Sequence, residues 1–131
     1  MNRGGLVFEN IKKGRRGEAI AQKFLRKNGF KIKETNYRSS FGEIDIIATE
    51  GDDIVFIEVK TRHNVSYGAP GASVGRRKQR HITRAARQYL KEKGLNEDTV
   101  GVRFDVVGIE FKGKECEIGL VRDAFDAVEF F

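Results

Sequence analysis

Two carboxylates and one lysine stand close together between residues 42 and 62. Asp45 is followed after twelve residues by Glu58, and Lys60 lies two positions beyond Glu58. Both stretches have the composition of strands, and the short connection at Gly51 makes these strands antiparallel neighbours. Pairing outward from that turn brings Asp45 alongside Glu58 and Lys60. The sequence therefore predicts two carboxylates that converge beside one ammonium group.

Like charges held this close together need a partner. Two carboxylates about 4 Å apart repel each other by about 4 kcal/mol at an effective dielectric constant near 20. Lys60 could offset part of that repulsion, and a divalent cation could offset all of it. Mg²⁺ or Mn²⁺ suits carboxylates together with water and phosphate oxygens, and such an ion polarises a phosphodiester and activates a bound water. Lys60 would then orient that water or help to deprotonate it. The alternative is a buried Asp–Lys–Glu ion-pair network without catalysis.

The alternation of side chains along a strand predicts which of them face the site. Side chains two positions apart point to the same side of the sheet. Glu43 and Asp45 are therefore expected to share one face of their strand, and Ile44 and Ile46 the other. Glu43 could add a ligand or be a solvated acid at the strand's start. The run IVFIEV at residues 54–59 is apolar on both faces, which is typical of a strand at the centre of a sheet.

Positive charge is concentrated in one segment of the chain. The net charge is +6, yet residues 72–93 alone hold eight Lys or Arg against one Glu, a net charge of +7. Such clustering is typical of a surface that meets a polyanion, and the alternative is a solvated helix face. The expected phosphate contacts are Arg76, Arg77, Arg80, Arg84 and Arg87, with Arg38 and Arg62 near the cleft.

Two polar residues of this segment lie on the apolar stripe of the predicted helix. Lys78 and Gln79 precede Ile82 by four and three residues, so they could point toward a reacting phosphate. The alternative is that the helix has not yet reached the core at this end. In the preceding loop, Tyr67 could stack on an unpaired base or pack beneath the loop.

Bulk properties restrict the class of protein. A length of 131 residues fits one domain. No apolar run approaches the roughly 20 residues of a membrane span, and the N-terminus has no apolar signal region, so we expect a cytoplasmic protein that does not contact a membrane. Cys116 is the only cysteine, which excludes an internal disulfide. Any metal should therefore be a hard cation held by oxygen atoms.

Hydrophobic periodicity predicts an α/β domain with a mixed sheet flanked by helices. The first 13 residues are expected to be flexible, and Asp105 is expected to pair with a basic neighbour. The predicted order α-β-β-β-α-β consists of a helix at 14–28, strands at 31–38, 43–49 and 54–61, a loop at 63–74, a helix at 73–93 and a strand at 100–111, with a shorter strand at 115–120.

The spacing of Asp45, Glu58 and Lys60 resembles the PD-(D/E)xK motif of nucleases with the restriction-endonuclease-like fold, except that Ile44 replaces the proline. The resemblance extends over roughly residues 14–110. The segments GRRGEAIAQKFLRKNGFKI, NYRSSFGEIDIIA, FIEVKTR, YGAP, RAARQYL and RFDVVGI together resemble the YraN-like family of small prokaryotic proteins. Their layout is also similar to that of archaeal Holliday-junction resolvases.

This resemblance implies a metal-dependent endonuclease. Asp45 and Glu58 would bind Mg²⁺ or Mn²⁺ with the Val59 carbonyl, Lys60 would act on the water, and Glu18 would join the acidic site. The alternative is that Glu18, an acid in the first turn, only stabilises its helix through a favourable interaction with the helix dipole. The resolvases imply a branched or structured substrate, DNA in preference to RNA, and a homodimer. The main alternative function is a non-catalytic nucleic-acid-binding module. A further alternative is a protein–protein adaptor that uses the acidic C-terminal third of the chain.

Overall fold

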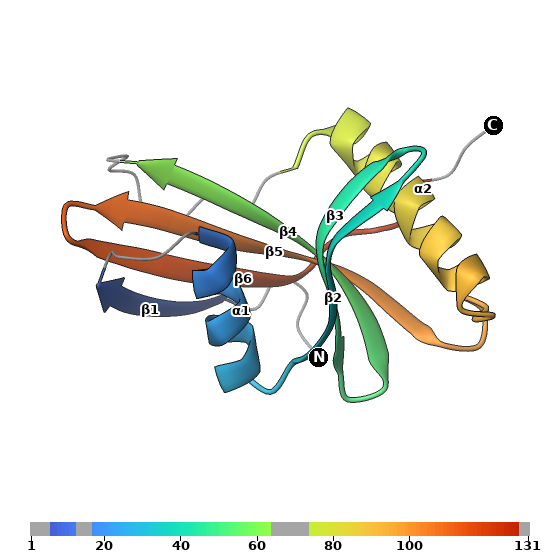
Figure 1. Cartoon of the computed structure of the whole chain (residues 1–131), viewed down its shortest axis with the longest axis horizontal. Helices are drawn as coiled ribbons and strands as arrows, with labels where there is room; N and C mark the ends of the chain where they lie inside the picture. The colour runs from blue at the N-terminus through green and yellow to red at the C-terminus, as the bar shows by residue number, and fades with distance from the viewer. Residues whose placement is uncertain (1–5, 13–16, 64–73, 129–131) are drawn as a thin grey trace.

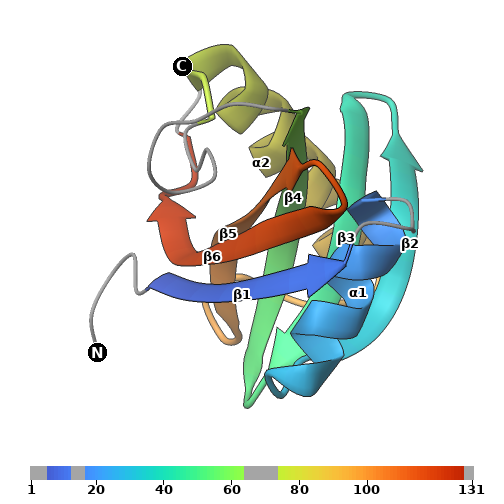
Figure 2. The same cartoon turned by 90° about the vertical axis from the view of Figure 1, so that its left-hand side faces the viewer.

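A six-stranded mixed sheet forms the centre of the molecule, with one helix on each face (Figures 1 and 2). The computed structural model describes residues 6–12, 17–63 and 74–128. The elements are β1 (Leu6–Lys12), α1 (Gly17–Lys27), β2 (Lys31–Ser39), β3 (Gly42–Glu50), β4 (Asp53–His63), α2 (Arg76–Glu92), β5 (Gly101–Lys112) and β6 (Glu115–Phe125).

The strands lie in the order β1-β6-β5-β4-β3-β2. Neighbouring strands are antiparallel except β4 and β5, which run parallel. Parallel neighbours need a crossover connection, and here α2 provides it. α2 packs on the face of the sheet opposite to α1. Figure 2 shows α1 in front of the sheet and α2 behind it.

β4 is a central strand because apolar side chains leave both of its faces. Val55 and Ile57 pack in the core under α1, whereas Ile54 and Phe56 pack on the α2 side. Two covered faces explain the continuous apolar run in this segment. The prediction of a central strand there is confirmed.

Both helices end in the same backbone motif. In α1, the N–H of Phe30 bonds to the Leu25 carbonyl at 3.0 Å and the N–H of Gly29 bonds to the Arg26 carbonyl at 3.2 Å. Gly29 has φ 94°, and Gly94 takes the same place after α2 with φ 68°. Only glycine enters this region without a steric penalty, so the Asn-Gly and Lys-Gly pairs stop the helices.

The observed architecture confirms the predicted α/β class, the mixed sheet and the order of the central elements. Two strands go beyond the prediction. Residues 6–12 were expected to be flexible but form the edge strand β1, and β6 extends to Phe125 instead of ending at Leu120. An edge strand depends on its partner, here β6, and the periodicity of seven residues carries little signal.

No helix in the described part of the chain has the length and apolar character to cross a membrane.

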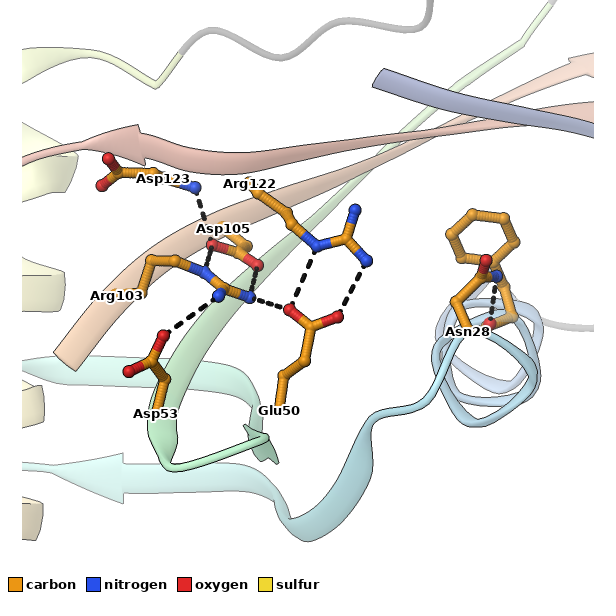
Figure 3. A network of polar contacts seen from close by, with 8 residues as sticks. Asn28, Glu50, Asp53, Arg103, Asp105, Arg122 and Asp123 are labelled. Carbon is orange, nitrogen blue, oxygen red and sulfur yellow. Dashed lines mark hydrogen bonds and ion pairs between the residues drawn. The ribbon is translucent and has the colours of Figure 1, made fainter. Parts of the chain in front are cut away.

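A polar network fastens the β3–β4 hairpin to β5 and β6 (Figure 3). Asp105 is fully buried, and its carboxylate accepts two bonds of 2.9 Å from Arg103. Arg103 also donates to Glu50 at 2.6 Å and to Asp53 at 3.3 Å. Arg122 of β6 donates to both oxygens of Glu50, and these bonds hold the pKa of Glu50 below its ordinary value. The expectation that Asp105 pairs with a basic neighbour is confirmed.

Replacing Arg103 tests how much this network contributes to stability. Arg103→Met would leave the Asp105 carboxylate buried without a cationic partner, with the Asp123 N–H as its remaining donor among the described residues, so the free energy of unfolding should fall by about 3 kcal/mol or more. Urea denaturation would measure the loss. Lys114→Met, which removes the same charge from an exposed turn, should change stability by no more than about 0.5 kcal/mol. Equal effects of the two substitutions would contradict a structural role for the network.

Candidate active site

β3 and β4 separate at Asp45. The ladder between them runs from Glu50↔Asp53 to Ile46↔Ile57. Beyond that point, the backbone N–H of Val59 donates to the Oδ2 atom of Asp45 at 2.8 Å. A side-chain carboxylate thus replaces a backbone carbonyl as the acceptor. This point, where the two strands diverge, is called the β3–β4 fork below.

The alternation of side chains in β3 breaks at the same residue. Ile44 and Ile46 were expected to share one face, but Ile44 packs on the α2 side with Tyr37, and Ile46 packs under α1. In the neighbouring strand β2, Asn36 lies between the residues paired with Ile44 and Ile46 and has φ 53°. This left-handed backbone conformation twists the strand pair locally. The prediction that Ile44 and Ile46 share one face of the sheet is therefore wrong.

The Glu58 carboxylate at the β3–β4 fork acts on the neighbouring Asp45. Burial raises the pKa of Asp45 to about 7, with a further rise caused by the Glu58 carboxylate and only partial relief from the Val59 N–H. Glu58 is itself well covered, since its side chain is 12% exposed and its Oε1 atom is buried with no hydrogen-bond partner among the residues that the structure describes. A buried carboxylate oxygen without a donor is costly. The predicted proximity of Asp45 and Glu58 is therefore present.

One ammonium group at the β3–β4 fork comes from α2. Lys78 Nζ lies 3.3 Å from Glu58 Oε2. Lys78 reaches Glu58 because it stands one turn before the buried Ile82, on the inner side of the helix. Lys60, which the sequence singled out, is half-buried two positions after Glu58 on β4. The sequence predicted that Lys78 points toward a phosphate. Its position on the apolar stripe of the helix was the signal that could have predicted the contact with Glu58.

Glu18 is held by a different partner. Its Oε1 atom accepts a hydrogen bond of 2.7 Å from Asn36 Nδ2. The start of α1 lies close to β4 at this point. A Cβ atom on Gly17 would lie only 2.5 Å from Thr61 Cγ2. Within residues 6–12, 17–63 and 74–128, no three His, Cys, Asp or Glu side chains are grouped to hold a metal ion. The catalytic role of Glu18 therefore stays a prediction.

The oxygen atoms at the β3–β4 fork suit a hard cation. Asp45 and Glu58 supply carboxylates, and regular strand geometry puts the Val59 carbonyl on the same side of β4 as its N–H, which donates to Asp45. This set of two carboxylates and one carbonyl leaves room for water and phosphate ligands, as Mg²⁺ requires. The unpartnered Glu58 Oε1 atom is the observation that fits such an ion.

The outer face of α2 carries the predicted phosphate contacts. At 3.6 residues per turn, these side chains lie opposite the buried stripe that contains Ile82 and Tyr89. They are Arg76, Arg77, Arg80 and Arg84, all exposed, and the half-buried Arg87. Gln79 is directed elsewhere, since its Nε2 atom donates to the Val74 carbonyl at 2.8 Å.

The remaining predicted contacts are more scattered. Arg38 is exposed on β2 and pairs with Glu43 at 3.2 Å, so Glu43 has a surface partner. Arg62 is half-buried on β4, two positions past Lys60. Tyr67 and most of the predicted loop lie outside the described residues.

Comparisons with other proteins place these residues in a family context. The sequence profile of a family described as "Uncharacterised protein family UPF0102" matches residues 17–109. A UPF0102 protein of Syntrophus aciditrophicus is 46% identical over 120 residues, covering 92% of this chain and 93% of that protein. Another, from Desulfosudis oleivorans, is 47% identical over 114 residues, covering 87% and 89%. SfsA of Pyrococcus furiosus, solved in complex with Ca²⁺, is 14% identical with a TM-score of 0.37, and the similarity spans 81% of this chain and 60% of that chain.

The pKa of Asp45 predicts how stability depends on pH when no metal ion is bound. Because its folded pKa of about 7 exceeds its ordinary 3.8, the folded state keeps a proton that the unfolded state has lost between these values. Raising the pH through this window should therefore destabilise the fold. Asp45→Asn should remove this contribution. Urea denaturation in EDTA should show that the variant gains stability over the wild type as the pH rises from about 4 to about 8. A constant difference across this range would contradict the shifted pKa.

Proposed function

The chain belongs to the uncharacterised protein family UPF0102, as its YraN-like motifs predicted, and we propose that it is a metal-dependent nuclease that hydrolyses phosphodiester bonds in DNA. The observation that carries the proposal is the β3–β4 fork. There, Glu58 keeps a buried oxygen without a partner beside an Asp45 whose pKa is raised to about 7. Perturbed pKa values of this kind are concentrated at functional sites.

The residues of the fork would divide the work of hydrolysis. Asp45, Glu58 and the Val59 carbonyl would hold Mg²⁺ or Mn²⁺, which supplies Lewis-acid polarisation of the phosphate and a water of lowered pKa. Lys60 would orient that water or take up its proton. Lys78, which pairs with Glu58 at 3.3 Å, would contact a phosphate oxygen once the Glu58 charge is neutralised. Glu18 would assist from the first turn of α1.

The outer face of α2 would position the nucleic-acid backbone. Its arginines begin beside Lys78 and continue along the helix, so one strand could contact both the helix and the β3–β4 fork. Contacts of this kind neutralise phosphates and carry little sequence information. A branched or structured DNA substrate and a homodimer belong to the same proposal, on the similarity in layout to the resolvases.

A second candidate is a nucleic-acid-binding module without catalysis. The Lys78–Glu58 ion pair favours it, because this contact already compensates part of the acidic charge. Both candidates predict salt-sensitive binding. They differ in the requirement for a metal ion, which the following experiment addresses.

Cleavage of DNA separates the two candidates directly. Purified protein would be incubated with plasmid, linear, single-stranded and four-way-junction DNA, with Mn²⁺ or with EDTA. We expect cleavage with Mn²⁺ and none with EDTA. Asp45→Asn and Lys60→Ala should each lower the cleavage rate by about 100-fold or more, while binding to DNA survives.

The control for this experiment is Glu43→Gln, which removes an acid of β3 that pairs with the surface residue Arg38. It should leave cleavage near the wild-type rate. Binding without cleavage of any of these substrates would favour the non-catalytic module. Cleavage that persists in EDTA, or in Asp45→Asn, would rule out the proposed mechanism.

The salt dependence of binding tests the role of α2. Each phosphate contact contributes about 0.9 to the slope of log K against log salt concentration on duplex DNA. Arg77→Ala combined with Arg80→Ala should therefore lower the slope by about 1.8. Arg26→Ala, on the exposed surface of α1, should leave the slope unchanged. Equal slopes for the α2 variant and the wild type would remove α2 from the interface.

A further inference from the structure

A surface cavity of about 540 Å³ lies between the β2–β3 turn and the outer face of α2. Phe41, Arg84, Arg87, Gln88 and Lys91 line it, and this cavity is called the Phe41 pocket below. Figure 1 shows the β2–β3 turn next to α2, and a Cβ atom on Gly42 would lie 3.8 Å from His81 Cβ. The pocket thus belongs to the same surface as the basic residues of α2.

Phe41 leaves much of its ring in solvent. It is 43% exposed, one of two large apolar side chains so exposed among the described residues. The turn does not need this ring, because Ser39 Oγ donates to the Gly42 carbonyl at 2.9 Å and accepts from the Phe41 N–H at 3.0 Å. These bonds use the backbone of Phe41 and not its side chain. The phenyl group is therefore available to a ligand.

The walls of the Phe41 pocket are positive. Three of its five lining residues are cations and none is an acid. The guanidinium of Arg84 lies 5.6 Å from the centre of the Phe41 ring, within the range of a cation–π contact. Arg87 pairs with Glu97 at 3.1 Å, and Arg84 and Lys91 are both exposed on this surface. An aromatic ring among cations suits a flat group that carries negative charge beside it.

We propose that the Phe41 pocket binds an unpaired base of the nucleic acid, which stacks on the Phe41 ring while its flanking phosphates contact Arg84 and Lys91. Stacking of this kind tolerates any base, because every base has a π face. A fully paired duplex keeps its bases stacked on one another and presents phosphates and base edges but no free base face. The preferred substrate is therefore DNA in which a single-stranded segment adjoins a duplex. This inference depends on the nucleic-acid binding of the proposed function.

The position of Phe41 links this pocket to the β3–β4 fork. Asp45 lies four positions after Phe41, which corresponds to about 14 Å of extended strand. That length equals about four steps along one strand of a duplex, at 3.4 Å per step. The stacked base and the phosphate at the fork can therefore belong to the same short segment of DNA.

Binding in EDTA tests the proposal without any contribution from cleavage. The probe is a duplex with a short single-stranded gap, compared with an intact duplex of the same length and the same ends. The wild type should bind the gapped duplex more tightly than the intact one. Phe41→Ala should weaken binding to the gapped duplex by about 5- to 150-fold, which corresponds to about 1–3 kcal/mol for one stacked base. It should change binding to the intact duplex by less than about twofold.

Two further variants keep this test interpretable. Phe41→Trp should retain the preference for the gapped duplex. Because the chain contains no Trp, its fluorescence would report stacking directly by quenching with the gapped duplex alone. Leu95→Ala removes the other exposed large apolar side chain and should bind both duplexes as the wild type does. The melting temperatures of all variants would be compared first.

The outcomes separate this inference from the proposed function. Equal losses on both duplexes, or no loss on either, would overturn the stacking role of Phe41, while metal-dependent cleavage could still stand. Failure of the wild type to bind either duplex would overturn the inference and the proposed function together. A Phe41→Trp signal that is not quenched by the gapped duplex would also overturn the inference.

Discussion

The hydrogen bond from the Val59 N–H to the Asp45 carboxylate sets the geometry on which the site depends. It occurs where the ladder between β3 and β4 stops at Ile46↔Ile57. The bond holds a carboxylate in a partly buried place beside Glu58, and it compensates the burial only in part. Natural proteins break local rules of stability mainly where function requires it. The raised pKa of Asp45 and the buried Oε1 atom of Glu58 are therefore the features that the proposed metal site would account for.

The rest of the molecule supports this fork from several directions. The core on both faces of β4 fixes the strand that carries Glu58 and Lys60, and α2 brings Lys78 to Glu58. At the far end of the same hairpin, Arg103 and Arg122 bind Glu50. Asp53 and Glu58 are separated by about 16 Å of strand, so the hairpin is anchored away from the reactive groups. The residues that anchor the hairpin are therefore separate from the carboxylates of the β3–β4 fork.

Local signals predicted much of the fold and the central pair of the site. The apolar run of β4 and the Gly51 turn were sufficient to place Asp45 beside Glu58. The rest depended on contacts between distant segments. The divergence of Ile44 from Ile46 follows from the backbone of Asn36 in another strand. The same limit applies to the Lys78–Glu58 ion pair and to the Phe41 pocket, since each joins α2 to a residue that lies twenty or more positions earlier in the sequence.

Direct observation of a bound cation is the decisive measurement. Crystals soaked in Mn²⁺ near pH 8, measured above the manganese absorption edge, would give an anomalous difference map. We expect a peak between the carboxylates of Asp45 and Glu58 and the Val59 carbonyl, roughly 2.0–2.3 Å from their oxygen atoms. The peak should be absent from crystals of Asp45→Asn. A map with manganese bound elsewhere, and with Lys78 still paired to Glu58, would contradict the account.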